Sequence, residues 1–445
     1  MSAAAGHRLA TMLICAPIVI ALDAGCGKDS SPAPSTPAAA ECINVVDESG
    51  KTTDECLPVA PDSERVDLAT PTFSRPTSIT NPLHPTSRVE QVIMGGHVDG
   101  KPFRTEVTLL PGTKPITWRG ATTDTAIIQY VAYLDGRIHE VALDWYAQAD
   151  DGSVWYLGED VFNFQDGKVA DTKGTWVASD KTPAAMIMPA KPAVGNVYRP
   201  ENAPEVVFEE VRVQKVDQTV AGPSGNVSGA IEVMELHMDG TRERKVFAPG
   251  YGEFSTGNPG GDLEAVSLAV PTDSRQGPAP AEFGALSVAA ARVFEATASA
   301  GGDGVKQAAS ALGRAWEALF SKGIPPQMAS QMKTDIEALN GATDEGSAQA
   351  AALRVAQNEL DLRLLYQRVI DVDLAKLALW ARQLPVDVAA DDAGLVLADV
   401  AALDRVWERT QYGVQAPEAV DGASRSCGRR PTPRIFPRWT APRPR

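Results

Sequence analysis

Five Asp-Gly dipeptides separate runs of alternating apolar residues in the chain. They stand at residues 99–100, 135–136, 151–152, 166–167 and 239–240. Asp-Gly between such runs is a strong hairpin signal, because both central positions of the favoured turn take a positive φ. We therefore predict one antiparallel β domain over residues 88–272. A sheet of about ten strands must curl or pack on itself, so we expect a half-barrel or a sandwich.

Beyond the Gly- and Pro-rich stretch at residues 257–280, the apolar period changes from 2 to 3.6. Apolar stripes predict three helices starting near Phe283, Val305 and Pro326. A long helix over residues 345–384, ending at Pro385, and a fifth over 388–411 are expected to follow. Short connections favour antiparallel neighbours. The predicted fold class is α+β, with the antiparallel β domain followed by a separate α-helical bundle over residues 281–412.

The first thirty residues have the order of a secretory signal peptide. A basic start precedes an apolar run from Leu9 to Leu22, and Asp23-Ala24-Gly25-Cys26 follows. A cysteine after Ala-Gly resembles the signal of bacterial lipoproteins, although Asp23 stands where that family usually has a Leu-like residue. The resemblance implies that residues 1–25 are removed and that Cys26 is lipidated, with palmitate or a similar acyl chain as membrane anchor. An ordinary cleaved signal and an uncleaved anchor stay open as alternatives. All three place the chain outside the cytoplasm.

Residues 26–87 are rich in Pro, Ser, Thr and Ala. Such a composition buries too little apolar surface to offset its ordering entropy, so we predict a disordered tether. Cys42 and Cys56 lie within it, and in an oxidising compartment this pair would form a disulfide around a short polar loop. Two cysteines without a nearby histidine make a poor zinc site.

A second resemblance lies within the predicted sheet. Residues 245–254 read Lys-Val-Phe-Ala-Pro-Gly-Tyr-Gly-Glu-Phe, and residues 156–161 read Tyr-Leu-Gly-Glu-Asp-Val. Together they resemble hairpins that recur in uncharacterised bacterial envelope lipoproteins with a curved antiparallel sheet, over about residues 155–255. The resemblance implies a fold and a location, but no activity.

No segment carries a recognisable catalytic, cofactor or metal motif. The five histidines include no metal-binding pair, and no phosphate-binding loop or nucleophile elbow is present. Acidic neighbours such as Glu159-Asp160 and Glu209-Glu210 would point to opposite faces of a strand, so neither pair forms a site alone. We therefore expect no catalytic residues, no metal site and no cofactor.

Aromatic residues crowd the first half of the predicted sheet. On a curved sheet, inward-facing rings would line an apolar groove for a hydrophobic ligand. The candidates for the wall of this groove are Trp118, Trp145, Trp155 and Trp176. Packing of these rings in the core is the alternative interpretation.

The formal net charge of −16 argues against nucleic acid as a partner. Residues 416–445 form a Pro/Arg tract that we predict to be disordered, and it reads either as a native basic arm or as a frame-shifted end. The expected function is that of a non-enzymatic extracytoplasmic lipoprotein. It would bind or scaffold at the cell envelope, with a membrane, a hydrophobic ligand or an envelope protein as partner. The alternatives are an extracytoplasmic hydrolase of cell-wall or glycan material and a purely structural interaction protein.

Overall fold

The computed structural model describes residues 42–47, 50–204, 206–257, 261–299 and 302–413. The predicted signal peptide, the lipidation site Cys26 and the Pro/Arg tail at 416–445 lie outside these residues.

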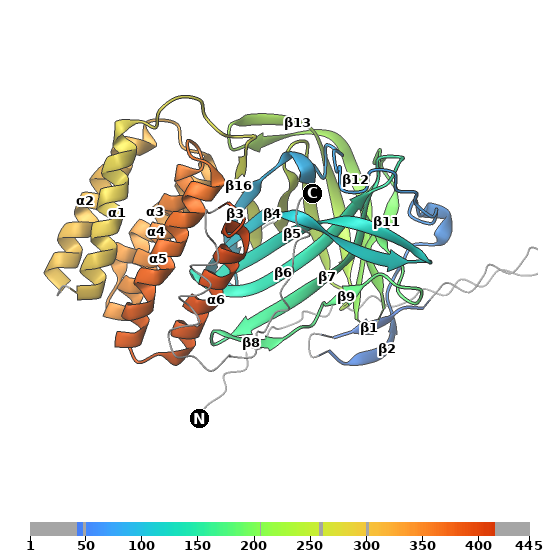
Figure 1. Cartoon of the computed structure of the whole chain (residues 1–445), viewed down its shortest axis with the longest axis horizontal. Coiled ribbons are helices and arrows are strands. Elements are labelled where there is room, and N and C mark those ends of the chain that lie inside the picture. The colour runs from blue at the N-terminus through green and yellow to red at the C-terminus, as the bar shows by residue number, and fades with distance from the viewer. Residues whose placement is uncertain (1–41, 48–49, 205, 258–260, 300–301, 414–445) are drawn as a thin grey trace, which may run out of the picture. The chain divides into compact units, whose positions relative to one another are not determined.

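The core of the described chain is a fourteen-stranded sheet in which every pairing is antiparallel, as predicted (Figure 1). Its path runs β10-β7-β6-β5-β4-β3-β16-β15-β14-β13-β12-β11, and β8 and β9 pair with β7. The edge strands β10 and β11 lie next to each other, but no ladder joins them in the described residues. The sheet is therefore strongly curled and open. Its strands are β3 (Gln91–Val98), β4 (Lys101–Trp118), β5 (Ala121–Leu134), β6 (Arg137–Gln148), β7 (Val154–Gln165), β8 (Lys168–Asp171), β9 (Trp176–Val177), β10 (Ala185–Met188), β11 (Val197–Ala203), β12 (Val207–Gly222), β13 (Gly225–His237), β14 (Arg242–Ala248), β15 (Gly252–Gly257) and β16 (Leu263–Val270).

The Asp-Gly turns form in two ways. Asp99, Asp135 and Asp166 take φ values of 50°, 51° and 49°, and the glycine after each also has a positive φ. These turns are the predicted type, with two left-handed positions. At the other two dipeptides, Asp151 and Asp239 instead accept a hydrogen bond from the backbone N–H two residues later, at 2.8 Å each. Only the glycine has a positive φ there.

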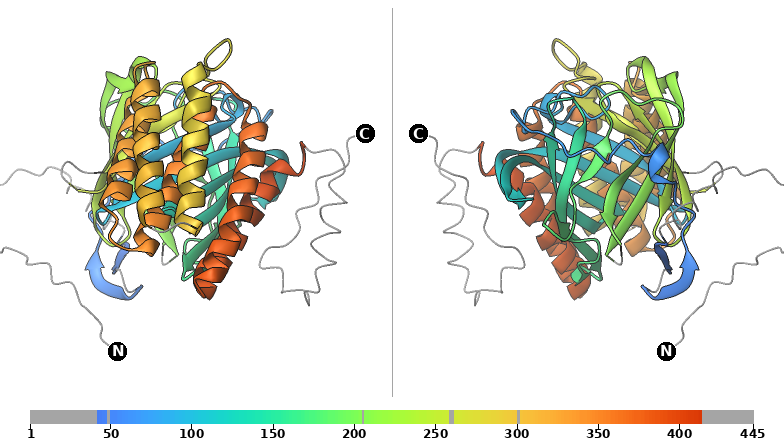
Figure 2. Two further views of the ribbon diagram at one scale, coloured as in Figure 1. Left: turned by 90° about the vertical axis from the view of Figure 1, so that its left-hand side faces the viewer. Right: turned by 90° about the vertical axis from the view of Figure 1, so that its right-hand side faces the viewer.

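Six α-helices follow the sheet within the described residues (Figure 2): α1 (Ala281–Ser299), α2 (Gly302–Phe320), α3 (Pro326–Gly341), α4 (Glu345–Arg363), α5 (Val369–Ala389) and α6 (Ala393–Thr410). The predicted long helix over 345–384 is two helices. The chain turns at residues 364–368, where Leu364 and Leu365 are fully buried and the carbonyl of Leu365 accepts from Arg275 N at 2.7 Å. Pro385 lies inside α5 and does not end it.

The helices cover one face of the sheet, which we call the outer face. One hydrophobic cluster joins strand residues such as Val131, Tyr133 and Phe162 to helix residues such as Leu286 and Trp380. The rings of Tyr133 and Trp380 stack at 5.9 Å. The helices therefore share one hydrophobic core with the sheet and do not form a separate core among themselves. No helix in the described part of the chain is both long and apolar enough to cross a membrane.

The segment before the sheet differs from the predicted tether. β1 (Asn44–Val46) and β2 (Thr52–Cys56) form a hairpin, and the predicted disulfide joins Cys42 to Cys56. Parts of the segment 57–90 pack against the curled sheet, and Ile79 is fully buried in the core of that sheet. The Asn81 side-chain amide donates to the carbonyls of Gly152 and Pro189, at 3.0 and 3.1 Å. A few buried apolar and amide groups therefore anchor a segment whose overall composition is typical of disorder.

Candidate functional site

The curled sheet surrounds a cavity of about 410 Å³ on its inner face, opposite the helices. Because directly paired residues of an antiparallel ladder face the same side, the ladders define that face. One row crosses β4, β5 and β6 through Val107, Tyr130 and Ala142. Part of the segment before the sheet, including His84 and Pro85, also lines the cavity.

Most of the cavity wall is apolar or aromatic. Tyr146 and Tyr156 lie opposite each other on β6 and β7, and their rings stack at 4.6 Å. His84 packs edge-on against Tyr146 at 4.7 Å, and burial lowers the pKa of His84 to about 4. This imidazole is therefore uncharged at neutral pH. The other apolar and aromatic wall residues include Val92, Met94, Val107, Leu109, Ile128, Tyr130, Ile187, Phe247 and Tyr251.

Carboxylates interrupt this apolar wall. The carboxylates that line the cavity are Glu140, Asp144, Glu159, Glu243, Glu253 and Glu264. Lys245 is the one charged base that faces them among the described lining residues. Its Nζ lies 2.6 Å from Glu235 Oε2 and 3.9 Å from Glu253 Oε2. The wall therefore carries far more acidic than basic groups.

Asp144 and Glu159 form the most buried pair in this wall. They are directly opposite on β6 and β7, and each is 8% exposed. The Tyr156 hydroxyl donates to Asp144 Oδ1 at 2.9 Å. Burial raises the pKa of Asp144 to about 7 and that of Glu159 to about 8, and each carboxylate disfavours ionisation of its neighbours. Two acids that keep protons near neutral pH thus share one wall without a cation between them.

Glu264 on β16 is another carboxylate of the cavity wall that is buried and has a raised pKa. It is 8% exposed and accepts a hydrogen bond from Thr105 Oγ1 at 2.5 Å. Burial raises its pKa to about 8, and the nearby Glu253 acts in the same direction.

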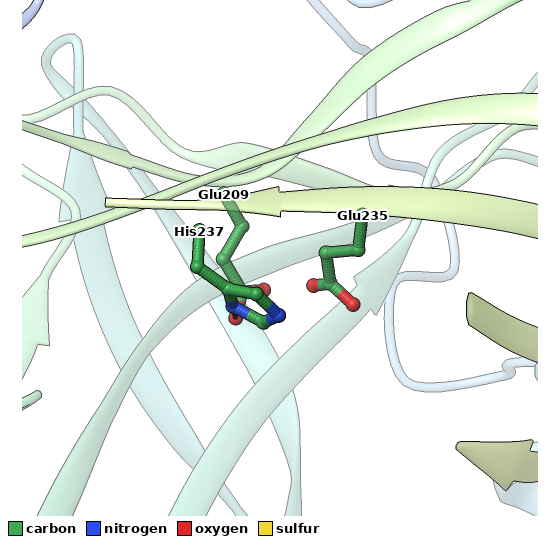
Figure 3. Close-up of side chains that lie close together, drawn as sticks. All are labelled: Glu209, Glu235 and His237. Atoms are coloured by element: carbon green, nitrogen blue, oxygen red, sulfur yellow. Dashed lines mark ion pairs between the residues drawn. The ribbon is translucent and has the colours of Figure 1, made fainter. Parts of the chain in front are cut away.

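A second group of side chains lies on the same face at β12 and β13 (Figure 3). Figure 3 shows Glu209, Glu235 and His237 projecting to one side of these strands. One ligand atom from each lies within 4.8 Å of the others. Burial lowers the pKa of His237, but hydrogen bonds with Glu209 and Glu243 outweigh it and raise the value to about 10.

The tryptophans named from the sequence do not line this cavity. All four are buried in one hydrophobic cluster: Trp118, Trp145, Trp155 and Trp176. Trp176 pairs with Glu159 and packs its ring edge-on against Tyr156 at 5.4 Å, but it is not among the residues that line the cavity. Tyrosines take the wall positions expected for the tryptophans.

The expected division of Glu209 and Glu210 between opposite faces is confirmed. Glu209 pairs with His237 on the inner face, whereas Glu210 accepts from the backbone N–H of Ala60 at 2.7 Å. Sequence reasoning missed the partners that strand pairing supplies, above all Glu235 for Glu209 and Glu159 for Asp144. An available signal was the alternation of Glu140, Ala142 and Asp144 along β6, which places two acids and a small residue on one face.

Comparison with known proteins adds no relative. No protein-family model, curated protein or solved structure matches the chain.

Proposed function

We propose that this protein is a non-enzymatic, extracytoplasmic binding protein whose inner cavity holds a small ligand with an apolar body and a positive charge. The observation that carries the proposal is the pairing, in one cavity, of an apolar and aromatic wall with six carboxylates and one charged base.

The size and lining of the cavity support an apolar ligand body. Small-molecule sites are concave and mostly apolar, with volumes from about 300 Å³ upward. The cavity has about 410 Å³, and Tyr130, Tyr146, Tyr156 and Phe247 contribute to its wall. Aromatic faces also attract cations, most strongly where water is excluded.

The excess of carboxylates supports a positive charge on the ligand. An ionised carboxylate that is buried without a partner is costly, and proteins respond by protonating it or pairing it. Burial raises the pKa values of Asp144, Glu159 and Glu264, and the nearby charges that act on the first two are those of other acids. Lys245 lowers the pKa of Glu264, but burial outweighs it. A ligand cation would supply the missing charge and allow these groups to ionise.

The extracytoplasmic location is part of the same proposal. The Cys42–Cys56 disulfide supports it, because such bonds persist in oxidising compartments. We propose lipidation at Cys26 as the means of attachment to the membrane. Intact mass measurement of the native membrane fraction tests this: an acylated chain beginning at Cys26 is expected, and an unmodified chain would contradict it.

Calorimetric titration with three probes of equal chain length tests the ligand class. Octyltrimethylammonium, octanol and octanoate share an apolar chain and differ in charge. We expect the cationic probe to bind at least about tenfold more tightly than octanol, because it gains ion pairing in a desolvated site. Octanoate is expected to bind weakest. Equal binding of all three, or preference for octanoate, would refute the proposal.

Neighbouring residues on β7 provide a matched pair of variants. Glu159 faces the cavity, whereas the adjacent Asp160 is partly exposed and lies 3.8 Å from Lys114. Glu159→Gln is expected to weaken binding of the cationic probe and to leave octanol binding unchanged. Asp160→Asn is expected to leave both unchanged. A loss of cationic binding in Asp160→Asn of the same size would point to a general effect of charge.

The Asp144–Glu159 pair also supports a second candidate, a hydrolase of glycan or cell-wall material. Two carboxylates that flank a scissile bond are the usual machinery of glycoside hydrolysis. Release of reducing ends from purified cell-wall polymer tests it. Activity that Asp144→Asn and Glu159→Gln each abolish would favour this function over simple binding, and no release by the wild type would remove it.

A further inference from the structure

Two neighbouring strands place an imidazole and two carboxylates at adjacent inner-face positions. Glu209 on β12 pairs directly with His237 on β13, and Glu235 lies two residues before His237 on the same strand. His237 Nδ1 lies 3.4 Å from Glu209 Oε1. Their ligand atoms and one from Glu235 all lie within 4.8 Å of one another (Figure 3).

A fourth polar atom from another strand is available on the same face. Tyr198 on β11 pairs with Val211, which in turn pairs with Glu235, so the tyrosine and the glutamate face the same side. Tyr198 is fully buried, and its hydroxyl has no hydrogen-bond partner among the described residues. A buried hydroxyl without a partner is costly. Burial and then the charge of Glu235 raise the pKa of Tyr198.

We propose that Glu209, Glu235 and His237 bind one divalent transition-metal ion of the zinc type, with the Tyr198 hydroxyl completing the site. One nitrogen and several oxygen donors suit Zn²⁺, Mn²⁺ and Co²⁺ better than thiolate-seeking ions. Ligand atoms stand about 2.0–2.2 Å from zinc, so they lie roughly 3–4 Å apart. Contraction of the three side chains by about 1 Å or less would close the site, and the protonated imidazole of His237 would release its proton to solvent as the ion binds.

The surroundings provide a route of entry and a competing charge. Glu209 and His237 have side chains that are 24% and 28% exposed, whereas Glu235 is 2% exposed. An ion can therefore reach the first two ligands from solvent. Lys245 Nζ lies 2.6 Å from Glu235 Oε2, so this ammonium would compete with the ion for the same carboxylate. On metal binding this ammonium would turn to Glu253, which it already approaches at 3.9 Å.

Titration of the intact mature chain with Zn²⁺ and with Co²⁺ alone, without any organic cation, tests the site. We expect one ion per chain and, for Co²⁺, the visible absorption of a low-coordinate site with nitrogen and oxygen ligands. His237→Gln and Glu209→Gln are expected to weaken binding by roughly tenfold or more. Tyr198→Phe removes only the unpartnered hydroxyl, so it should fold normally and weaken binding several-fold.

Two further variants separate a specific site from general charge effects. Lys245→Met removes the competing ammonium and is expected to tighten binding by about tenfold, a gain that damage to the fold would not produce. Glu232→Gln removes a β13 carboxylate that pairs with Lys215 and Arg244 instead, and is expected to change nothing. Absence of binding by the wild type, or equal binding by the wild type and the Glu209→Gln/His237→Gln double variant, would overturn the proposal.

Discussion

The two faces of the curled sheet bury charges in opposite ways. On the outer face, six side chains from the sheet and three helices form a network with equal numbers of acids and bases: Arg104, Glu106, Asp361, Asp373, Lys376 and Arg409. On the inner face, the described residues that line the cavity include six carboxylates and one charged base. The same sheet therefore carries one charge-balanced surface and one that is strongly acidic.

The outer network has a partner for every charge. Glu106 on β4 contacts Arg104, Lys376 and Arg409, and Lys376 Nζ lies 2.8 Å from Glu106 Oε1. Asp361 binds Arg104 with 2.5 and 2.6 Å contacts. Burial raises the pKa of Glu106, but the three cations outweigh it and hold the pKa well below its ordinary value. This network attaches α4, α5 and α6 to the sheet.

The charges of the outer face stabilise the fold, whereas we propose that the carboxylates of the inner face bind a ligand. A balanced buried network is complete, and removing one member leaves an uncompensated ion. An acidic wall is incomplete in the free protein and gains stability when a cation arrives. The two faces should therefore respond in opposite directions to the same kind of substitution.

The largest expected effect is loss of stability from Glu106→Gln. The substitution removes one negative charge, so Arg104, Lys376 and Arg409 stay buried with one carboxylate fewer to balance their charges. We expect the free energy of unfolding to fall by about 3–5 kcal/mol, measured by urea denaturation. Glu264→Gln on the inner face serves as the matched variant and should be neutral or stabilising at pH 8. Equal destabilisation by both would erase the distinction between the faces.

The pH dependence of stability is the next largest effect. The pKa of Glu264 is about 8 in the folded protein and near 4.5 in an unfolded chain, so the folded state retains a proton that the unfolded state has lost. Its contribution to stability is therefore present below about pH 4.5 and is lost as the pH rises to about 8. The groups that face Glu264 are Thr105, Tyr130, Glu243, Lys245 and Glu253.

Urea denaturation at pH 5 and pH 8 measures this dependence. Glu264→Gln should remove about 2–4 kcal/mol of the decline in unfolding free energy between these values. An unchanged decline in the variant would show that Glu264 ionises normally in the folded state.

A smaller effect is expected on cation affinity. Because octyltrimethylammonium favours ionised carboxylates, its affinity should rise about tenfold between pH 6 and pH 8.5, in parallel with ionisation of Asp144 and Glu159. Both carboxylates face Tyr156 and Glu201, and Asp144 also faces Glu140 and Tyr146. Octanol affinity is the control and should not change. A cation affinity that falls with pH would contradict the acidic-wall account.

The smallest predicted effect concerns Tyr156→Phe. The hydroxyl donates to Asp144 Oδ1 at 2.9 Å and favours the ionised form of that carboxyl. Its loss should raise the pKa of Asp144 further and weaken cation binding at pH 7 by about 1 kcal/mol, about fivefold. Titration of the variant at pH 9 is the internal control, because the difference from wild type should shrink once Asp144 is ionised in both.

Much of the fold could be predicted from local signals, and the site could not. The Asp-Gly dipeptides and the change to a 3.6-residue period depend on neighbours in the sequence, and both indicated the correct type of element, although not every boundary. The acids along β6 also alternate locally, but alternation normally marks a solvent-facing surface. Here the helices cover one face, with Val131 and Phe162, and the curl encloses the other, so that the acids on that second face line a cavity.

Long-range pairing explains the remaining differences. Asp144 meets Glu159 because β6 and β7 are paired, and Glu209 meets Glu235 because β12 and β13 are. The break between α4 and α5 depends on the buried turn at Leu364 and Leu365 and on Arg275, nearly ninety residues earlier. No property of residues 345–384 alone reveals that contact.

Proton release on cation binding tests the central claim most directly. Calorimetric titration of the protein with octyltrimethylammonium at pH 7.5, in two buffers of different ionisation enthalpy, gives the number of protons exchanged per ligand. The acidic inner wall predicts net release, because the bound cation lowers the raised pKa values of Asp144, Glu159 and Glu264. Binding with no proton exchange, or with proton uptake, would contradict it.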